Sequence, residues 1–192
     1  MIRKRRWLWL VALVALIGVI IGGVQIYRTA QDKFYRAKYP LKYTEWVETY
    51  AAQYDLDPAL VYAVICTESG FDASAQSGAG AIGLMQMTPD TFDWAQFREK
   101  VKDPIGKEML TDPETNIHYG CATLHHLGQL FSTENAVLAA YNAGMGNVSK
   151  WLSDPAYSDD GETLHTIPFK ETRNYVQKVA AAKEMYRSLY GI

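Results

Sequence analysis

A stretch without any charged side chain runs from Trp7 to Val24 and sets the start of the chain apart from the rest. At roughly 18 to 20 residues, it is long enough to cross a bilayer as a helix. The cations Arg3-Lys4-Arg5-Arg6 precede it, so the positive-inside tendency leaves the N-terminus in the cytoplasm and everything after Tyr27 outside. We therefore predict a basic cytoplasmic segment at 1–6, a transmembrane signal anchor at 7–27, a connector at 28–42 and a folded extracytoplasmic domain at 43–192.

A cleaved signal peptide is the alternative interpretation, since it also has a basic start and an apolar middle. Such a peptide usually has a shorter apolar core and ends in a small-x-small cleavage site. The nearest candidates, Gly22-Gly23-Val24-Gln25 and Arg28-Thr29-Ala30-Gln31, match that site poorly. The sequence therefore favours an uncleaved, single-pass anchor.

Charge and cysteine content exclude several function classes. Without the four N-terminal cations, 15 basic residues face 21 acidic ones, and no cationic block that would follow a phosphate backbone remains, so we expect no nucleic-acid partner. Cys66 and Cys121 form no Cys-x-x-Cys pair and do not lie among histidines at ligand spacing, so we expect no metal and no cofactor. Their apolar neighbours favour buried reduced thiols, although a single bridge in an oxidising compartment stays open.

Apolar residues recur at helical spacing through the folded domain. Helix starts are marked by capping residues, most of them followed by a first-turn proline, at Asp57-Pro58, Thr88-Pro89, Asp112-Pro113 and Thr133. Helices are predicted over 44–54, 57–69, 90–97, 112–130, 133–141 and 170–190, with a further turn from 146. No pair of alternating strands stands out, so we predict a mainly α domain.

Glu68 is the ionisable residue that stands out. Val61, Val64, Ile65 and Glu68 fall at i, i+3, i+4 and i+7 of the helix that starts at Asp57, so the carboxyl group points the same way as the apolar side chains. Burial disfavours the charged form of a carboxyl group, which raises its pKa and keeps a proton on it near neutral pH. The alternative is an ordinary solvated glutamate in a last helical turn.

The glycine-rich segment Ser77-Gly78-Ala79-Gly80-Ala81-Ile82-Gly83 follows this helix. Repeated glycine is costly in a helix or strand and is favoured where the backbone turns sharply or approaches a ligand. We interpret the segment as the wall of a cleft next to Glu68.

Four blocks of the sequence together resemble the family 1 soluble-type lytic transglycosylases. The blocks are Glu68-Ser69-Gly70-Phe71, 77–89 (SGAGAIGLMQMTP), Ala140-Tyr141-Asn142-Ala143-Gly144 and 167–176 (IPFKETRNYV). They occur in the family's order, between about Tyr43 and Tyr190. The resemblance implies a lysozyme-like α domain in the bacterial envelope. It would cleave the β-1,4 bond between N-acetylmuramic acid and N-acetylglucosamine of peptidoglycan, leaving a 1,6-anhydromuramyl end.

The resemblance also implies roles for particular residues. Glu68 stands at the family's catalytic acid, which first protonates the bridging oxygen and then, as carboxylate, takes the proton of the muramyl 6-hydroxyl. Ser77 matches a serine that hydrogen-bonds near the substrate's acetamido group, and its alternative role is that of a turn serine. Met85 and Gln86 match positions that line the cleft, although Met85 by its spacing alone suits the core.

Four further site residues follow from the last two blocks. Tyr141 is expected near Glu68, and Asn142 is expected to bond substrate or brace the loop. Glu171 matches a buried glutamate that tunes Glu68 or fixes the backbone, with an ion pair to Arg173 as the alternative. Tyr175 lies one turn further on the same helix face.

The sequence departs from the family pattern at Thr123, where a tyrosine is frequent, and we expect only packing consequences. Asp72 matches no family nucleophile and is assigned a loop role, while His125-His126 is interpreted as a solvated helix face. Two other functions stay open: a hydrolytic muramidase on the same fold, and a non-catalytic peptidoglycan-binding scaffold in an envelope machine with assembly partners that the sequence does not identify.

Overall fold

The computed structural model describes the backbone of residues 2–192, and the side chains of Trp7, Leu13 and all residues from Leu16 onward. The chain divides into two compact units, Met1–Pro40 and Leu41–Ile192.

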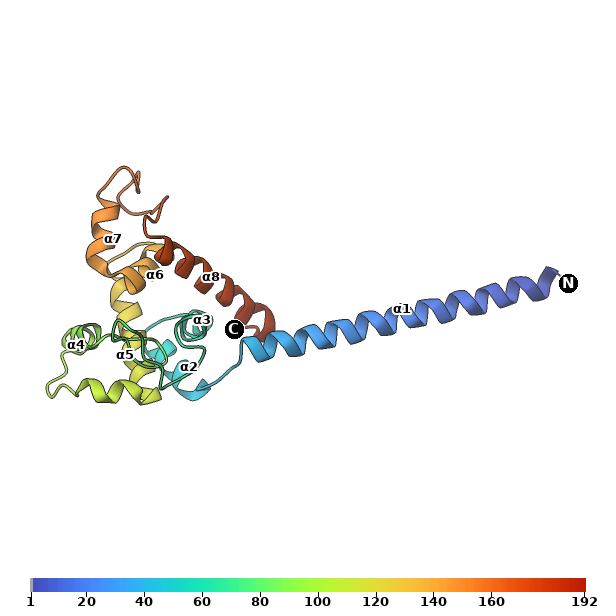
Figure 1. The fold of residues 1–192 in the computed structure, drawn as a ribbon, viewed down its shortest axis with the longest axis horizontal. Coiled ribbons are helices and arrows are strands. Elements are labelled where there is room, and N and C mark those ends of the chain that lie inside the picture. Colours follow the sequence, from blue (N-terminus) through green and yellow to red (C-terminus); the bar gives the residue numbers. More distant parts are fainter. Residues whose placement is uncertain (1) are drawn as a thin grey trace. The chain divides into compact units, whose positions relative to one another are not determined.

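The first unit is a single helix, α1 (Ile2–Lys38), drawn in blue in Figure 1. It continues through the segment predicted as a connector, where the Arg36 Nε lies 2.9 Å from the Asp32 carboxylate one turn earlier. Among the residues that the structure describes, no helix combines the length and apolarity needed to cross a bilayer. Within the predicted anchor 7–27, the side chains of residues 8–12, 14 and 15 lie outside the described ones.

The second unit is built from helices, as predicted. They are α2 (Thr44–Gln53), α3 (Pro58–Glu68), α4 (Pro89–Arg98), the 3-10 helix η1 (Lys107–Thr111), α5 (Pro113–Gly128), α6 (Glu134–Ala143), α7 (Met145–Leu152) and α8 (Lys170–Tyr190). In the described part of the chain, β-structure is limited to isolated bridges that pair Ile82 with Gln76 and with Met87. The mainly α prediction is therefore confirmed.

The predicted helix starts are confirmed by their capping contacts. The side chains of Asp57, Thr88, Asp112 and Thr133 accept hydrogen bonds from the backbone N–H groups of Ala59, Thr91, Thr115 and Ala136, at 2.9, 3.2, 2.9 and 3.3 Å respectively. Each such cap satisfies a backbone donor that the first helical turn leaves without a partner, and stabilises the helix by about 1 kcal/mol. These four residues fix where four of the helices begin.

Helix α3 is the centre of the domain. Every residue from Ala59 to Ile65 is buried, so the helix is enclosed on all sides and not only along the predicted stripe of Val61, Val64 and Ile65. Helix α8 packs along α3, and α2 covers it from another side (Figure 1). Glu68, the last residue of α3, is therefore positioned by the C-terminal end of a buried helix.

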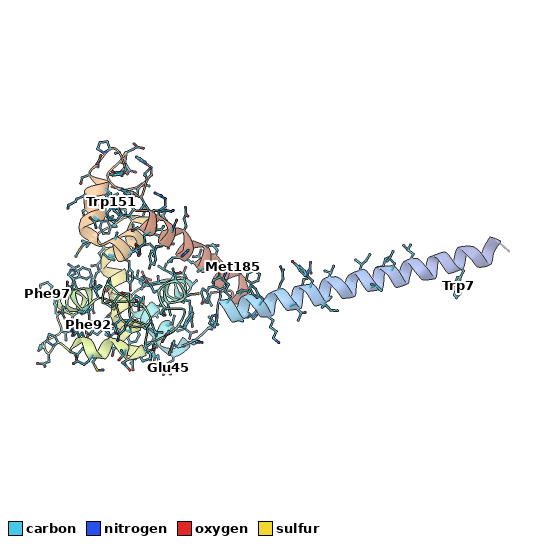
Figure 2. All side chains as sticks on the ribbon, viewed as in Figure 1. Trp7, Glu45, Phe92, Phe97, Trp151 and Met185 are labelled. Carbon is cyan, nitrogen blue, oxygen red and sulfur yellow. The ribbon has the colours of Figure 1, made fainter. Side chains whose placement is uncertain are left out.

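Helix α4 and the 3-10 helix η1 both pack against α5. The two phenylalanines of α4 differ: Phe92 is buried, while Phe97 is 78% exposed at the edge of the unit (Figure 2). Phe92 packs with Leu110 of η1 and Tyr119 of α5. The sequence did not predict η1, because five residues are too few to show a helical period.

Candidate active site

The loop between α3 and α4 forms one wall of the site, and Asn116 of α5 anchors it. The Asn116 Oδ1 accepts a hydrogen bond from the Met85 N–H at 2.7 Å, and its Nδ2 donates to the carbonyl oxygens of Leu110 and Ile82 at 2.8 and 3.0 Å. Asn116 is fully buried. Sequence reasoning missed its role, and the one signal was a polar residue on the apolar face of the predicted helix.

Close approach of the backbone explains a glycine in this loop. Gly83 has φ +83°, and a Cβ atom there would collide with the Leu110 carbonyl and the Asn116 side chain. Gln86 also has a left-handed backbone, φ 48°, and its Nε2 donates to the carbonyls of Ala75 and Gly83 at 3.1 and 3.0 Å. The glycine-rich segment is thus a tightly turned wall, as predicted.

The Ser69 side chain joins this loop to the end of α3. Its hydroxyl donates to the Leu84 carbonyl at 2.8 Å and accepts from the Phe71 N–H at 3.1 Å. The loop and the Glu68 backbone are therefore held together one residue from the carboxyl group.

A cavity of about 290 Å³, called the central cavity below, opens where α3, the loop, α6 and α8 meet. Six of the residues predicted for the site line it: Glu68, Ser77, Gln86, Tyr141, Asn142 and Glu171. They come from four separate segments, namely α3, the loop that follows it, α6 and α8, so the fold brings together residues that are far apart in the sequence.

Burial governs the Glu68 carboxyl group. Desolvation raises its pKa from the ordinary 4.5 to about 7. The Tyr175 hydroxyl lies close enough to offset part of that rise, although it is buried and has no partner at full hydrogen-bond geometry. Glu68 therefore holds a proton over much of the acid-to-neutral range and is able to donate it.

Two tyrosines flank Glu68. The Tyr141 hydroxyl donates to the Met85 carbonyl at 2.8 Å, which fixes its ring against the loop. Burial, and next the charge of Glu68, raise the pKa of Tyr141 and of Tyr175 well above their ordinary range. Both tyrosines thus stay neutral at physiological pH. The expected proximity of Tyr141 to Glu68 agrees with this coupling.

Ser77 lines the central cavity and also stabilises the turn over residues 77–81. Its Oγ accepts a hydrogen bond from the Ala81 N–H at 3.0 Å, and its carbonyl accepts from the Gly80 N–H at 3.0 Å. The hydroxyl hydrogen stays available to donate to a group in the cavity. The turn role and the site role therefore coexist.

Two site predictions need correction. The Met85 side chain is fully buried, packs where Gly120 leaves room, and does not line the central cavity; only its backbone carbonyl serves the site. Glu171 is exposed, where a buried glutamate was expected, because it lies in the first turn of α8 at the mouth of the cavity. In the described structure Glu171 and Arg173 form no ion pair, and the Arg173 guanidinium donates to the Ile167 carbonyl at 2.7 Å.

Two further hollows share lining residues with the central cavity. A polar hollow of about 260 Å³ shares Glu68, Asn142 and Glu171 with it and extends along α8 past Tyr175 to Lys178. An apolar hollow of about 220 Å³ shares Thr91 and Tyr141 with it and extends to Trp94, Leu127 and Met145. These three hollows share lining residues and are together called the groove below; Glu68 lines two of them.

Three other predictions concern residues outside the groove. Asp72 has the expected loop role, since its carboxylate accepts from the Ser74 N–H and hydroxyl at 2.9 and 2.7 Å. Cys66 and Cys121 are not joined in a disulfide. The prediction of a solvated His125-His126 face was wrong.

These two histidines instead join helices together. His126 is buried, with its Nε2 2.6 Å from the Glu99 carboxylate, and the His125 Nδ1 lies 2.8 Å from the Tyr54 carbonyl. The reason is that α2 and the end of α4 pack over this part of α5 and leave no room for solvent at His126.

Comparison with known proteins agrees with this arrangement. The profile described as Transglycosylase SLT domain matches residues 45–163, and that of the Soluble lytic transglycosylase helical domain matches 166–192. Since the first alone covers more than half of the chain, the protein belongs to the soluble lytic transglycosylase family, and its fold is the mainly helical, lysozyme-like fold of that family.

Three relatives illustrate the match. The Soluble lytic murein transglycosylase of Salmonella typhimurium is 35% identical over 80% of this chain and 24% of its own length. The Membrane-bound lytic murein transglycosylase C of Cronobacter sakazakii is 33% identical over 76% of this chain and 46% of its own length. A solved lytic transglycosylase of Pseudomonas aeruginosa, an inactive glutamate-to-glutamine mutant, is 30% identical over 78% of this chain and 24% of that chain, with a TM-score of 0.68. The chain thus spans only about a quarter of the soluble relatives.

Proposed function

We propose that this protein is a membrane-anchored peptidoglycan lytic transglycosylase. It cleaves the β-1,4 bond between N-acetylmuramic acid and N-acetylglucosamine and leaves a 1,6-anhydromuramyl end. The single observation that carries the proposal is the Glu68 carboxyl group, whose pKa burial raises to about 7 and which lines both the central cavity and the polar hollow next to it.

Glu68 acts twice in this reaction. Its carboxylic acid first donates a proton to the bridging oxygen, so the bond from that oxygen to the muramyl C1 breaks and N-acetylglucosamine leaves with a free 4-hydroxyl. The Glu68 carboxylate then takes the proton of the muramyl 6-hydroxyl, whose oxygen bonds to C1. This returns Glu68 to its acid form, and no water is consumed.

The groove supports this use of one carboxyl group. Most glycosidases place two carboxyl groups across the bond to be broken. Here the substrate's own acetamido group would share the positive charge that develops at C1. The Ser77 hydroxyl, on the same cavity wall, is positioned to orient that acetamido group, and Gln86, Asn142 and Tyr175 would line the sugars on either side.

The relatives support the substrate class. Those compared are called lytic murein transglycosylases, and the solved P. aeruginosa protein is inactive when a glutamate is replaced by glutamine. The loss of activity in that mutant supports an equivalent catalytic role for Glu68 in this chain.

We further propose that residues 7–27 anchor the protein in a bacterial plasma membrane, with the domain from residue 43 outside the cytoplasm. Apolar side chains of α1 such as Val19, Ile20, Ile21 and Ile26 are more than half exposed, and a basic segment precedes them. Lipid would cover such a surface at no cost in solvation. Carbonate extraction of cell membranes tests this: an anchored protein stays in the pellet, and release would refute the anchor.

Replacing Glu68 by Gln tests the catalytic assignment. The variant keeps the size and most hydrogen-bonding capacity of the side chain but has no proton to donate, so release of muropeptides from purified sacculi should fall at least a thousandfold. Unchanged turnover with an intact fold would refute the assignment and favour the peptidoglycan-binding scaffold.

The hydrolytic muramidase remains the second candidate, because the exposed Glu171 carboxylate lines the same cavity and is able to hold a water molecule. Mass spectrometry separates the two outcomes, since an anhydro end weighs one water less than a reducing end. Products that are all reducing would replace the transglycosylase by a hydrolase. Glu171→Gln should leave anhydro formation within a few-fold.

A further inference from the structure

Helix α1 carries an apolar stripe that continues beyond the predicted anchor. Its residues follow one another at alternating spacings of three and four, and a spacing that averages 3.5 residues keeps side chains on one face of a helix. This face is called the α1 stripe below, and it consists of Leu13, Leu16, Ile20, Gly23, Tyr27, Ala30, Phe34 and Ala37.

The α1 stripe is open to its surroundings. Its five large side chains are each more than half exposed, namely Leu13, Leu16, Ile20, Tyr27 and Phe34. On the opposite face beyond residue 27, the Arg36 Nε lies 2.9 Å from the Asp32 carboxylate, and Thr29 is also polar. This part of α1 is therefore amphipathic, and an amphipathic helix is stable when its apolar face is covered.

Lipid alone does not cover the whole stripe. The 37 residues of α1 extend about 55 Å as a helix, whereas the hydrocarbon core of a bilayer is about 30 Å thick. With the anchor starting at Trp7, the core ends near residue 27, and Phe34 lies about 10 Å further along the helix axis. The headgroup layer adds only about 5 to 8 Å on each side. The stripe from Phe34 to Ala37 therefore needs a cover other than lipid.

A second copy of the same chain meets this need. Chains anchored by the same segment have one orientation and one depth, so the stripes of two copies meet at the same height. A repeat of 3.5 residues is also what a left-handed pair of helices requires at its a and d positions. From residue 20 onward, large side chains at a alternate with glycine or alanine at d, which leaves room for the rings of Tyr27 and Phe34 between two helices.

We propose that α1 is a parallel homodimerisation helix, in which the α1 stripe of one copy packs against that of a second copy, from the membrane into the segment that follows it. The proposal rests on the proposed function only in the anchoring by residues 7–27, which sets the copies at one depth. The catalytic role of Glu68 does not enter it. Each dimer would carry two catalytic domains on one paired anchor.

Two lysines limit the strength of this pairing. With Tyr27 and Phe34 at a, Lys33 takes position g and Lys38 takes position e. In a parallel pair, the g residue of one heptad faces the e residue of the next heptad on the other helix, so Lys33 of each copy faces Lys38 of the other. Like charges so placed weaken the association. Replacing one lysine by glutamate should therefore strengthen the dimer, and replacing both should cancel the gain.

Disulfide cross-linking in membranes maps the face of α1 that meets the second copy. A cysteine is placed in turn at each position from 27 to 37 of the full chain, in a Cys66→Ala background that keeps the fully buried Cys121. Since a disulfide needs Cα atoms within about 7 Å, covalent dimer should peak at 27, 30, 34 and 37 and fall about fivefold at 29, 32 and 36. The background without an added cysteine is the control and should stay monomeric on a non-reducing gel.

Sedimentation equilibrium of the full chain in detergent measures the strength of the dimer. Phe34→Asp should raise the dissociation constant about a hundredfold, because each copy loses a buried ring and two carboxylates face each other. Thr29→Asp adds the same charge on the opposite face of the helix and should leave the constant unchanged. Lys33→Glu should lower it about tenfold, and adding Lys38→Glu should restore the parent value. Circular dichroism establishes that each variant keeps its helix content.

Several results would overturn the proposal. These are cross-linking that is even around the helix, cross-linking that peaks on the face of Thr29, Asp32 and Arg36, and a covalent product that contains a different protein. Equal effects of Phe34→Asp and Thr29→Asp on the dissociation constant would also overturn it.

Failure of the proposed function shows separately. If carbonate extraction releases the chain but the dimer and its dependence on Phe34 persist, the helix pair stands and the anchor falls. If the chain pairs as expected but does not cleave sacculi, only the catalytic role of Glu68 falls. If membranes retain the chain, sacculi are cleaved and cross-linking is even around α1, the helix pair falls alone.

Discussion

Burial, and not a charged partner, sets the raised pKa of the Glu68 carboxyl group. Desolvation is the largest influence on its pKa, and the neutral Tyr175 hydroxyl acts in the opposite direction. A carboxyl group tuned in this way is sensitive to water entry, because any change that wets the groove lowers its pKa toward the ordinary value. The pKa of Glu68 therefore reports how far water enters the groove.

The raised pKa predicts a pH-dependent cost in stability. Because the folded-state pKa of about 7 is above the ordinary 4.5, the contribution of Glu68 is fully present below pH 4.5 and is lost as the pH rises through 7. Glu68→Gln should therefore match the parent in free energy of unfolding at pH 4. At pH 8 it should exceed the parent by about 3 kcal/mol. Urea denaturation at the two pH values measures both.

Equal stabilities at pH 8 would mean that Glu68 ionises at its ordinary pKa. As a control, Glu171→Gln should show no comparable difference between the two pH values, since Glu171 is exposed.

Single residues were predictable to the extent that their chemistry showed in the sequence. Glu68 was predicted from its position at the end of an apolar stripe, whereas Ser77, Gln86, Tyr141 and Asn142 were predicted only from the resemblance to the family, and the structure brings all five to one cavity. Met85 was misplaced, because side-chain direction in an irregular loop follows no period, and here its backbone hydrogen bond to Asn116 accompanies an inward side chain.

At the scale of elements, the loop that carries Ser77 and Gln86 is held by one buried side chain. Asn116→Ala would remove the side-chain partner of the Met85 N–H and of the Leu110 carbonyl, while the Ile82 carbonyl would keep its hydrogen bond from the Met87 N–H. We expect a loss of about 3 kcal/mol in the free energy of unfolding, since buried polar groups left unsatisfied each cost 1 kcal/mol or more. Asn147→Ala removes only one hydrogen bond, to the Ala143 carbonyl, and should cost less than 1 kcal/mol. Equal losses in the two variants would show that Asn116 is not the anchor.

The helices that carry the site are joined at their far ends by Lys183 of α8. Its ammonium lies 2.5 Å from the Glu134 carboxylate at the start of α6 and 3.4 Å from that of Asp57 at the start of α3. Lys183 is itself buried. Lys183→Met should lower the free energy of unfolding by about 2 kcal/mol, because two carboxylates then lose their shared cation. Thermal unfolding with the exposed Lys150→Met as control measures this, and the same melting temperature in both variants would contradict it.

Helix starts were the most predictable elements, because Asp57, Thr88, Asp112 and Thr133 act within one turn of the chain. The histidine pair was misinterpreted for the opposite reason. Whether His126 meets water depends on α4 and α2, which are distant in the sequence, and its partner Glu99 follows no local rule.

For the whole molecule, the division at Pro40 and Leu41 predicts independent folding of the second unit. A fragment of residues 41–192 should unfold cooperatively at the melting temperature of the full chain in detergent. It should also cleave soluble glycan fragments at the same rate. On membranes that carry intact sacculi the fragment should be slower, since it lacks the proposed anchor. A fragment that is unfolded or inactive on soluble substrate would show that α1 contributes to the domain.

The groove itself was the least predictable feature. Its three hollows are bounded by α3, the loop, α4, α5, α6 and α8, and their volumes depend on how these elements pack. The consequence of Thr123 illustrates this: the sequence suggested only a packing change, while the structure places that residue on the floor of an open hollow.

Titration of the Glu68 carboxyl carbon by NMR tests the central claim most directly. With glutamate labelled at this carbon and Glu68→Gln as the assignment control, the account predicts a pKa of about 7 and an alkaline loss of sacculus cleavage at the same pH. A midpoint near the ordinary 4.5, with activity unchanged through neutral pH, would contradict it.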